Sequence, residues 1–180
     1  MVLIALLSLS IRGSVQRNNL QAKEIDSLLL VTEKMDSIEK HFSDFLPLGE
    51  PLDTIDISSE FGGRHDPDDG HWEFHEGLDL RGIWTDTVYA TGSGTIKLSG
   101  GCGGYGRCVV INHIGGYGSR YAHLYKIFVK KGTFVTKGQP IGLVGNSGHA
   151  TGYHLHYEVF KDSLYLDPLK WMTLMEDGKL

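Results

Sequence analysis

The chain has 180 residues, of which 41% are hydrophobic and 10% aromatic, and these values are typical of a folded globular protein rather than a disordered one. Its formal net charge is −5 and its lysines and arginines do not cluster, so the sequence carries no electrostatic signature of nucleic-acid binding. This length allows one domain with a full hydrophobic core and a smaller additional segment.

Residues 1–17 begin with an apolar run that ends before Arg12. A membrane-spanning helix needs about 20 apolar residues, and this run is shorter. It has the length of the apolar part of an export signal but lacks a basic start and a clear cleavage site. We therefore expect the remnant of an export signal or of a membrane anchor. The alternative is the buried start of an ordinary helix.

Residues 18–46 contain no glycine or proline and are predicted to form an amphipathic helix. Its apolar positions recur at alternating intervals of three and four residues: Leu28, Val31, Met35, Ile38, Phe42 and Phe45. The stripe suits a short coiled coil with a second copy or a partner, and equally a helix packed on its own domain. It is shorter than the three or four heptads (about 21–28 residues) that support a coiled coil.

Residues 47–56 are predicted to be a linker, because two prolines and a glycine end the helix there. Residues 57–172 then change to short runs of strand formers separated by glycine-rich turns, and residues 173–180 form a tail. The candidate strands are 86–91, 94–99, 107–114, 118–123, 140–145 and 154–160. The fold class is therefore mainly β: an antiparallel sandwich or open barrel preceded by one helix.

The motif FHEGLDL is the first to carry ligand chemistry. On one extended strand, His75, Gly77 and Asp79 point to the same side, and the glycine leaves space above the backbone. Taken alone, a histidine near a carboxylate is weak support for a metal site.

Cys102 and Cys108 flank a glycine-rich reversal, GGYGR. A disulfide across such a hairpin is geometrically feasible and implies an oxidising compartment. The alternative is two free thiols near a strand end.

Two further motifs place histidines on predicted strands. His123 in YAHL alternates with apolar neighbours, and His154 and His156 in YHLHYEV share one strand face with Glu158. Two histidines that alternate with apolar residues favour function over packing. One of the pair would bind a metal and the other would face the substrate, although spacing does not say which.

Together these residues predict one catalytic Zn²⁺ per chain, held by two imidazoles and one carboxylate with a fourth position left open. Zinc bound in this way activates water, and the remaining histidines can take its proton.

Residues 57–171 resemble the lysostaphin-type (LytM-like) zinc metalloendopeptidases, which hydrolyse peptidoglycan. The resemblance rests on SEFGGRHDPDDGHWEFHEGLDLRG, on YAHL, on VKKGTFVTKGQPIGLVGNSGHATGYHLHYEV and on the final Asp167 and Pro168. The chain departs from the family pattern at Tyr153, where a proline is usual, at WTDTVYA, and at the two cysteines. None of these departures removes a ligand position.

The resemblance implies a role for each histidine of the motifs. His75, Asp79 and His156 occupy the positions of the zinc ligands, and His123 and His154 those of the two catalytic histidines. Arg64 and Tyr121 are candidates for substrate binding, with structural hydrogen bonding and core packing as their alternatives. Glu158 is either the hydrogen-bond partner of a ligand histidine or a solvent-facing residue.

The resemblance also implies a function: an exported zinc endopeptidase of the cell envelope, periplasmic or extracellular, that cleaves stem peptides or cross-bridges of peptidoglycan. The alternative is a catalytically silent domain that binds the wall or activates another hydrolase. A membrane tether through the N-terminus and self-association through residues 18–46 are further expectations.

Overall fold

The structure is a computed structural model that describes residues 2–65 and 70–173. The chain divides into two compact units, residues 1–41 and 42–180, which are taken here one at a time. Apart from Thr173, the predicted tail lies outside the described residues, as does Pro67 of the family-like motif.

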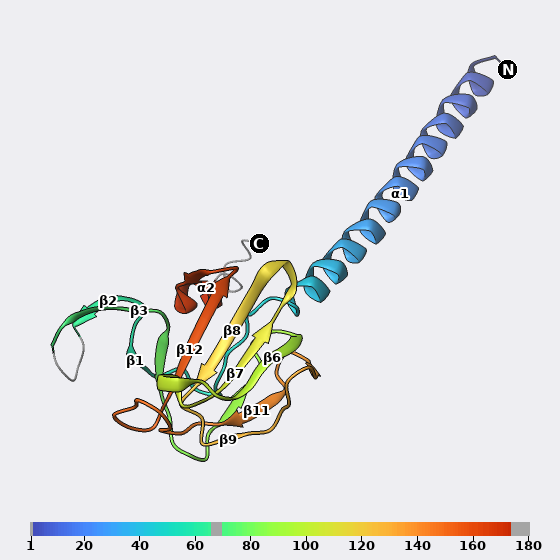
Figure 1. Cartoon of the computed structure of the whole chain (residues 1–180). Helices are drawn as coiled ribbons and strands as arrows, with labels where there is room; N and C mark the ends of the chain where they lie inside the picture. The colour runs from blue at the N-terminus through green and yellow to red at the C-terminus, as the bar shows by residue number, and fades with distance from the viewer. Residues whose placement is uncertain (1, 66–69, 174–180) are drawn as a thin grey trace. The chain divides into compact units, whose positions relative to one another are not determined.

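The first unit is occupied by α1 (Val2–Ser43), a single helix (Figure 1). The predicted boundary between residues 17 and 18 is therefore no break in secondary structure. Leu28, Val31, Met35 and Ile38 of the apolar stripe are exposed. Among the described residues, no helix has the length and apolarity that crossing a membrane requires.

The second unit begins with a segment that packs on the β-domain. Leu46, Leu48 and Leu52 are buried, and the Gly49 amide donates to the Thr91 carbonyl at 2.8 Å. The predicted linker over residues 47–56 is therefore wrong for much of its length, because its leucines contribute to the core.

The β-domain is built on one large antiparallel sheet in which eight strands are described (Figure 1). In spatial order these are β1 (Ile57–Ser59), β4 (Leu78–Arg81), β12 (His154–Lys161), β8 (Tyr117–Ala122), β7 (Arg107–Asn112), β6 (Gly94–Gly101) and β10 (Phe134–Val135), while β13 (Leu164–Leu166) pairs with β12. The predicted mainly β, antiparallel fold class is confirmed.

Smaller elements complete the domain. A second sheet contains β5 (Thr87–Tyr89), β11 (Pro140–Leu143) and β9 (Lys126–Ile127), and a hairpin contains β2 (Gly62–His65) and β3 (Trp72–His75). Two 3₁₀ turns, η1 (Gly103–Tyr105) and η2 (Ile114–Gly116), lie in connections, and α2 (Pro168–Thr173) follows β13. All six candidate strands fall on observed strands, whereas the short strands β1, β2, β9, β10 and β13 were not predicted.

Strand alternation separates the core from the functional face. On β12, Leu155, Tyr157 and Val159 are fully buried in the main hydrophobic cluster with residues of both sheets. His154, His156 and Glu158 alternate with them and therefore point to the other face of the large sheet.

A buried polar chain crosses the core beside this cluster. The His113 Nδ1–H donates to the Ser93 carbonyl at 3.0 Å, and its Nε2 lies 2.8 Å from the Ser119 hydroxyl. Burial lowers the pKa of His113, since desolvation disfavours the charged ring. As the pH falls, His113 therefore binds a proton in the unfolded chain before it does so in the folded chain.

We therefore expect the free energy of unfolding to decrease as the pH falls below about 6.5, the ordinary pKa of histidine. In His113→Gln, the decrease between pH 7.5 and pH 5 should be smaller than in the unmodified protein. Urea titrations at the two pH values measure this difference. A variant at exposed His65 serves as control, and an unchanged pH dependence in His113→Gln would contradict the assignment.

Candidate metal centre

The register of the large sheet brings two ligand candidates together from distant parts of the chain. His156 on β12 pairs with Asp79 on β4 and, on its other side, with Ala122 on β8. Because cross-strand partners carry their side chains on the same face, the Asp79 carboxylate and the His156 ring meet above the sheet.

His75 reaches the same point by a different route from the predicted one. Residues 75–79 are not a single strand: β3 ends at His75, β4 begins at Leu78, and the chain bends between them. The bend needs a glycine, since a Cβ on Gly77 would lie 2.8 Å from Nε2 of His156. The predicted clearance above Gly77 is thus used by the His156 ring.

Three ligand atoms converge at this point. Oδ1 of Asp79 lies 2.8 Å from Nδ1 of His156 and 3.2 Å from Nε2 of His75, and the two nitrogens are 3.1 Å apart. In a tetrahedral zinc site with bonds of about 2.0–2.1 Å, neighbouring ligand atoms stand about 3.3 Å apart. The spacing is close to that of a preformed metal site.

The outer nitrogens of both rings indicate which atoms carry lone pairs. Nδ1 of His75 lies 2.8 Å from the Glu60 carbonyl, and Nε2 of His156 lies 3.0 Å from the Glu158 carboxylate. Both partners only accept hydrogen bonds, so both outer nitrogens carry protons. In the neutral rings the inner nitrogens then present lone pairs toward Asp79. This arrangement suits a cation.

The electrostatics of the cluster favour an ionised Asp79. Burial by itself raises the pKa of this carboxyl, but when the inner nitrogens of His156 and His75 also carry protons, their hydrogen bonds and charge outweigh burial and hold the pKa well below its usual range. Burial by itself lowers the pKa of His156, whereas Asp79 and Glu158 together raise it. A proton on Nδ1 of His156 thus competes with a metal for the same position.

His123 and His154 stand beside the cluster. Their ring centroids are 4.7 Å apart, and Nε2 of His154 lies 3.9 Å from Oδ1 of Asp79. Each Nδ1–H donates to a backbone carbonyl: that of Ser147 at 2.8 Å for His123, and that of Gly152 at 3.0 Å for His154. Burial lowers the pKa of His123 to about 4, so at neutral pH its Nε2 offers a lone pair.

These five residues line a cavity of about 460 Å³ together with Arg64, Glu73, Cys102, Gly104, Tyr105, His149, Ala150 and Thr151. The Arg64 guanidinium donates from Nε to Glu73 at 2.7 Å and lies 3.4 Å from Oδ2 of Asp79. Arg64 thus lies in the wall of the cavity and pairs with a carboxylate at its centre.

Tyr121 does not lie in the cavity wall. Its side chain is fully buried in the core, its hydroxyl accepts from the Thr91 amide at 2.8 Å, and its ring packs on Tyr157. The predicted place of Tyr121 in the groove is therefore wrong, and core packing is what the structure shows. The reason is local: β8 ends at Ala122, and His123 has a φ of 59°, which breaks the alternation between Tyr121 and His123.

Tyr121→Phe is accordingly expected to weaken the fold without impairing chemistry at the cavity. The variant leaves the buried Thr91 amide without its acceptor, which costs about 1–3 kcal/mol of stability. Chemical denaturation measures the loss. Activity per folded molecule, measured where both proteins are fully folded, should stay within about twofold, which corresponds to about 0.4 kcal/mol in activation free energy. A large fall in that activity would contradict the core assignment and support a role for Tyr121 in substrate binding.

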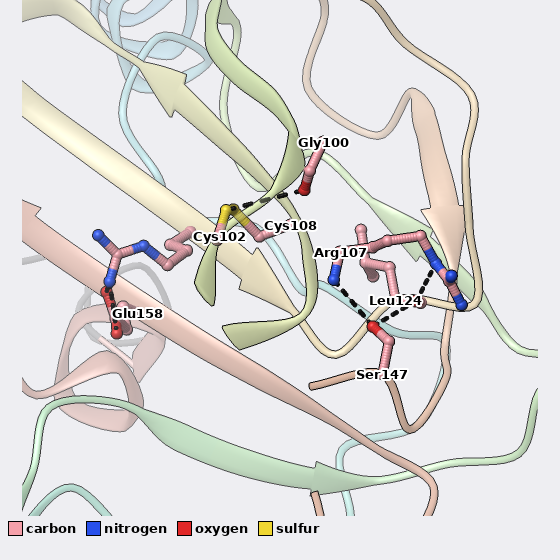
Figure 2. Close-up of a disulfide and its surroundings, with 8 residues drawn as sticks. Gly100, Cys102, Arg107, Cys108, Leu124, Ser147 and Glu158 are labelled. Atoms are coloured by element: carbon pink, nitrogen blue, oxygen red, sulfur yellow. Dashed lines mark hydrogen bonds and ion pairs between the residues drawn. A yellow bond between two sulfur atoms is a disulfide. The ribbon is translucent and has the colours of Figure 1, made fainter. Parts of the chain in front are cut away.

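The two cysteines form a disulfide at the rim of this cavity, with Cα atoms 6.0 Å apart (Figure 2). The loop that it closes is bonded to both neighbouring segments. The Tyr105 carbonyl accepts from the His123 amide at 2.9 Å, and the Arg107 amide donates to the Ser147 hydroxyl at 2.8 Å. Figure 2 shows the latter bond and the bond from Ser147 to the Leu124 carbonyl. The loop therefore supports the backbone on which His123 is held.

Residues that sequence reasoning left undecided or missed surround His156. Glu158 is fully buried and bonded to His156, so it is no solvent-facing residue. Arg120 pairs with Glu158 and lies over the ring of Tyr105. Arg120 lies in a predicted strand and Tyr105 in a stretch that resembles the family, but neither was predicted to belong to the site.

Comparisons with known proteins find similar sequences and similar folds. The sequence pattern of peptidase family M23 matches residues 73–168. Peptidoglycan DD-endopeptidase ShyA of Vibrio cholerae is 40% identical over 126 residues, which are 69% of this chain and 28% of that protein. The chain spans only about a quarter to a third of the length of the curated relatives that it matches.

Two solved structures share the fold. A zinc-containing peptidase from Vibrio cholerae superposes with a TM-score of 0.61 at 35% identity, covering 70% of this chain and 39% of that one. The catalytic domain of lysostaphin from Staphylococcus simulans gives a TM-score of 0.59 at 30% identity, covering 66% of this chain and 92% of that one.

Proposed function

Since the chain belongs to peptidase family M23, we propose that it is a zinc-dependent endopeptidase that hydrolyses peptide bonds in the stem peptides or cross-bridges of peptidoglycan. The observation that carries the proposal is the meeting of three lone-pair atoms, from His75, Asp79 and His156, beside two further histidines in one cavity. The names of a peptidoglycan endopeptidase and a zinc-containing peptidase among its relatives support the substrate and the metal.

His75, Asp79 and His156 would hold one Zn²⁺. Two imidazoles and a carboxylate are a ligand set of catalytic zinc, and the Glu60 carbonyl and the Glu158 carboxylate fix the ring tautomers that it needs. When bound, zinc supplies Lewis acidity, which polarises a carbonyl and acidifies water.

His123 and His154 act from the other side of the cavity. In each ring Nδ1 is committed to a backbone carbonyl, so Nε2 is the atom that takes up or returns a proton. A proton held at Nε2 also donates to an oxygen on which negative charge develops. The low pKa of His123 keeps that ring neutral and ready to accept.

Arg64 is proposed to contribute to substrate binding. It lines the cavity, and its guanidinium is already oriented by Glu73 and Asp79. A guanidinium in this position suits a carboxylate or a carbonyl of the peptide.

A cell-envelope location, periplasmic or extracellular, follows from the proposed substrate, and the disulfide between Cys102 and Cys108 suits an oxidising compartment. The tether through the N-terminus and the coiled coil through residues 18–46 stay predictions. Sedimentation of the full chain, compared with a chain that starts at Phe42, tests the second of them.

The test of the function is digestion of purified sacculi by the zinc-loaded protein, with and without a chelator. We expect soluble peptide-containing fragments only when zinc is present, and mass spectrometry of the products identifies the cleaved bond. The alternative, a silent wall-binding domain, predicts that zinc binds and sacculi are retained but never cut. That outcome on several wall types would overturn the enzymatic proposal.

A further inference from the structure

We propose that Glu158 and Arg120 form a positioning pair that fixes the ring of His156 for metal binding, and that Tyr105 shields this pair from water. The proposal rests on the proposed zinc site and names residues that the ligand set does not include. It gives a functional reason for an ion pair whose carboxylate is fully buried.

Glu158 lies two residues beyond His156 on β12, so both side chains stand on the same face of the sheet. The Glu158 side chain is 0% exposed, and its Oε1 accepts from Nε2–H of His156 at 3.0 Å. The other ring nitrogen, Nδ1, faces Asp79. The carboxylate therefore determines which nitrogen carries the proton and how the ring is turned.

Arg120 comes from the neighbouring strand β8, where it is the cross-strand partner of Glu158. Its Nη1 lies 3.0 Å from Oε1 and 2.7 Å from Oε2 of Glu158. Burying a carboxylate without a counter-charge is costly, and Arg120 supplies that counter-charge at hydrogen-bonding distance. The pair thus holds the Glu158 oxygens in place as acceptors for Nε2–H of His156.

Tyr105 covers the pair from the disulfide-closed loop. Its ring lies 4.4 Å from the Arg120 guanidinium carbon and 5.5 Å, centroid to centroid, from the His156 ring. Its hydroxyl donates to Glu76 at 3.2 Å. The ring stacks on the cation and excludes water from the carboxylate, which strengthens both contacts of Glu158.

Apolar replacement of the pair distinguishes a positioning role from a purely structural one. Replacing a buried pair by apolar residues of similar size often leaves a protein as stable or makes it more stable. If Glu158 and Arg120 serve only the fold, such a replacement keeps metal affinity as well. If they position His156, the fold survives and the affinity falls.

The experiment compares the unmodified full chain with the double variant Glu158→Leu/Arg120→Met and the single variant Glu158→Gln. Zinc affinity is measured by competition with a chromophoric chelator, and the melting temperature is measured on the zinc-free proteins. Loss of an outer partner of a ligand histidine typically weakens metal binding by about 10–100-fold, and we expect that loss in both variants. In the double variant the zinc-free melting temperature should match or exceed that of the unmodified chain.

Glu158→Gln keeps the proposal testable if the double variant does not fold. A glutamine lacks the negative charge and replaces one carboxylate oxygen by an NH₂ donor, which then faces either the Arg120 guanidinium or Nε2–H of His156. The matched control is Asp44→Leu/Lys137→Met, which replaces an acid and a base by the same apolar residues at a partly exposed pair with atoms 3.8 Å apart. The control should bind zinc as tightly as the unmodified chain.

Unchanged zinc affinity in folded Glu158→Gln or in the folded double variant would overturn the proposal. A second measurement is the nitrogen-15 spectrum of His156 in the zinc-loaded protein. It should show a proton on Nε2 that the Glu158 variants hold less firmly against exchange with water. Neither measurement uses peptidoglycan, so a protein that cuts no sacculi would still report on the positioning pair.

Discussion

Asp79→Ala is expected to abolish both zinc retention and peptidoglycan hydrolysis. The carboxylate is the only anionic group among the three proposed ligands, and its Oδ1 lies within 3.2 Å of both imidazole nitrogens. Its removal leaves two neutral rings, which bind a dication weakly, and the Lewis acidity of the metal is worth several kcal/mol. Activity should therefore fall by at least about 10³-fold.

Zinc content after dialysis, measured by atomic emission, and release of fragments from sacculi check this prediction together. Asp56→Ala is a suitable control, because the Asp56 carboxylate is exposed and pairs with Arg81, the last residue of β4. If Asp79→Ala kept stoichiometric zinc and normal activity, the proposed ligand set would have to be abandoned.

His123→Ala and His154→Ala are expected to separate catalysis from metal binding. Neither ring is among the three proposed ligands, yet both Nε2 atoms face the cavity in which the peptide would lie. Loss of a positioned proton-transfer group typically costs about 10²–10⁴-fold in rate. Each variant should lose activity in this range while its zinc content stays near one per chain.

His149→Ala is the matched comparison, since His149 also lines the cavity but is neither a proposed ligand nor a proposed proton-transfer group. It should alter the rate by less than about tenfold, which corresponds to 1.4 kcal/mol. Zinc loss in His123→Ala or His154→Ala would instead make that histidine a ligand.

Much of this site was accessible from the sequence, and strand alternation explains why. The period of two placed His154, His156 and Glu158 on one face before any contact was known, and β12 follows it over its whole length. The family resemblance added what spacing could not, namely that His156 rather than His154 would bind the metal. In the observed register His156 lies opposite Asp79.

The sequence did not predict features that depend on a break in strand alternation or on a contact with another strand. The positive φ of His123 reversed the expected side for Tyr121, and the bend at Gly77 divided an expected strand in two. Arg120 meets Glu158 only through the pairing of β8 with β12, which no local pattern encodes. Leu48 and Leu52 fell in a predicted linker because prolines stand beside them in the sequence, yet both are buried by tertiary contacts.

The sulfur bridge between Cys102 and Cys108 encloses so few residues that its opening costs the folded chain only about 2 kcal/mol by loop-closure arithmetic. A thiol reductant should consequently spare the global architecture while loosening the short span that carries Tyr105 and meets the backbone of His123. Protein produced in a reducing cytosol would then be folded but less active, because the backbone of His123 is less firmly held. Comparing turnover before and after oxidation is therefore a prerequisite for interpreting any inactive preparation.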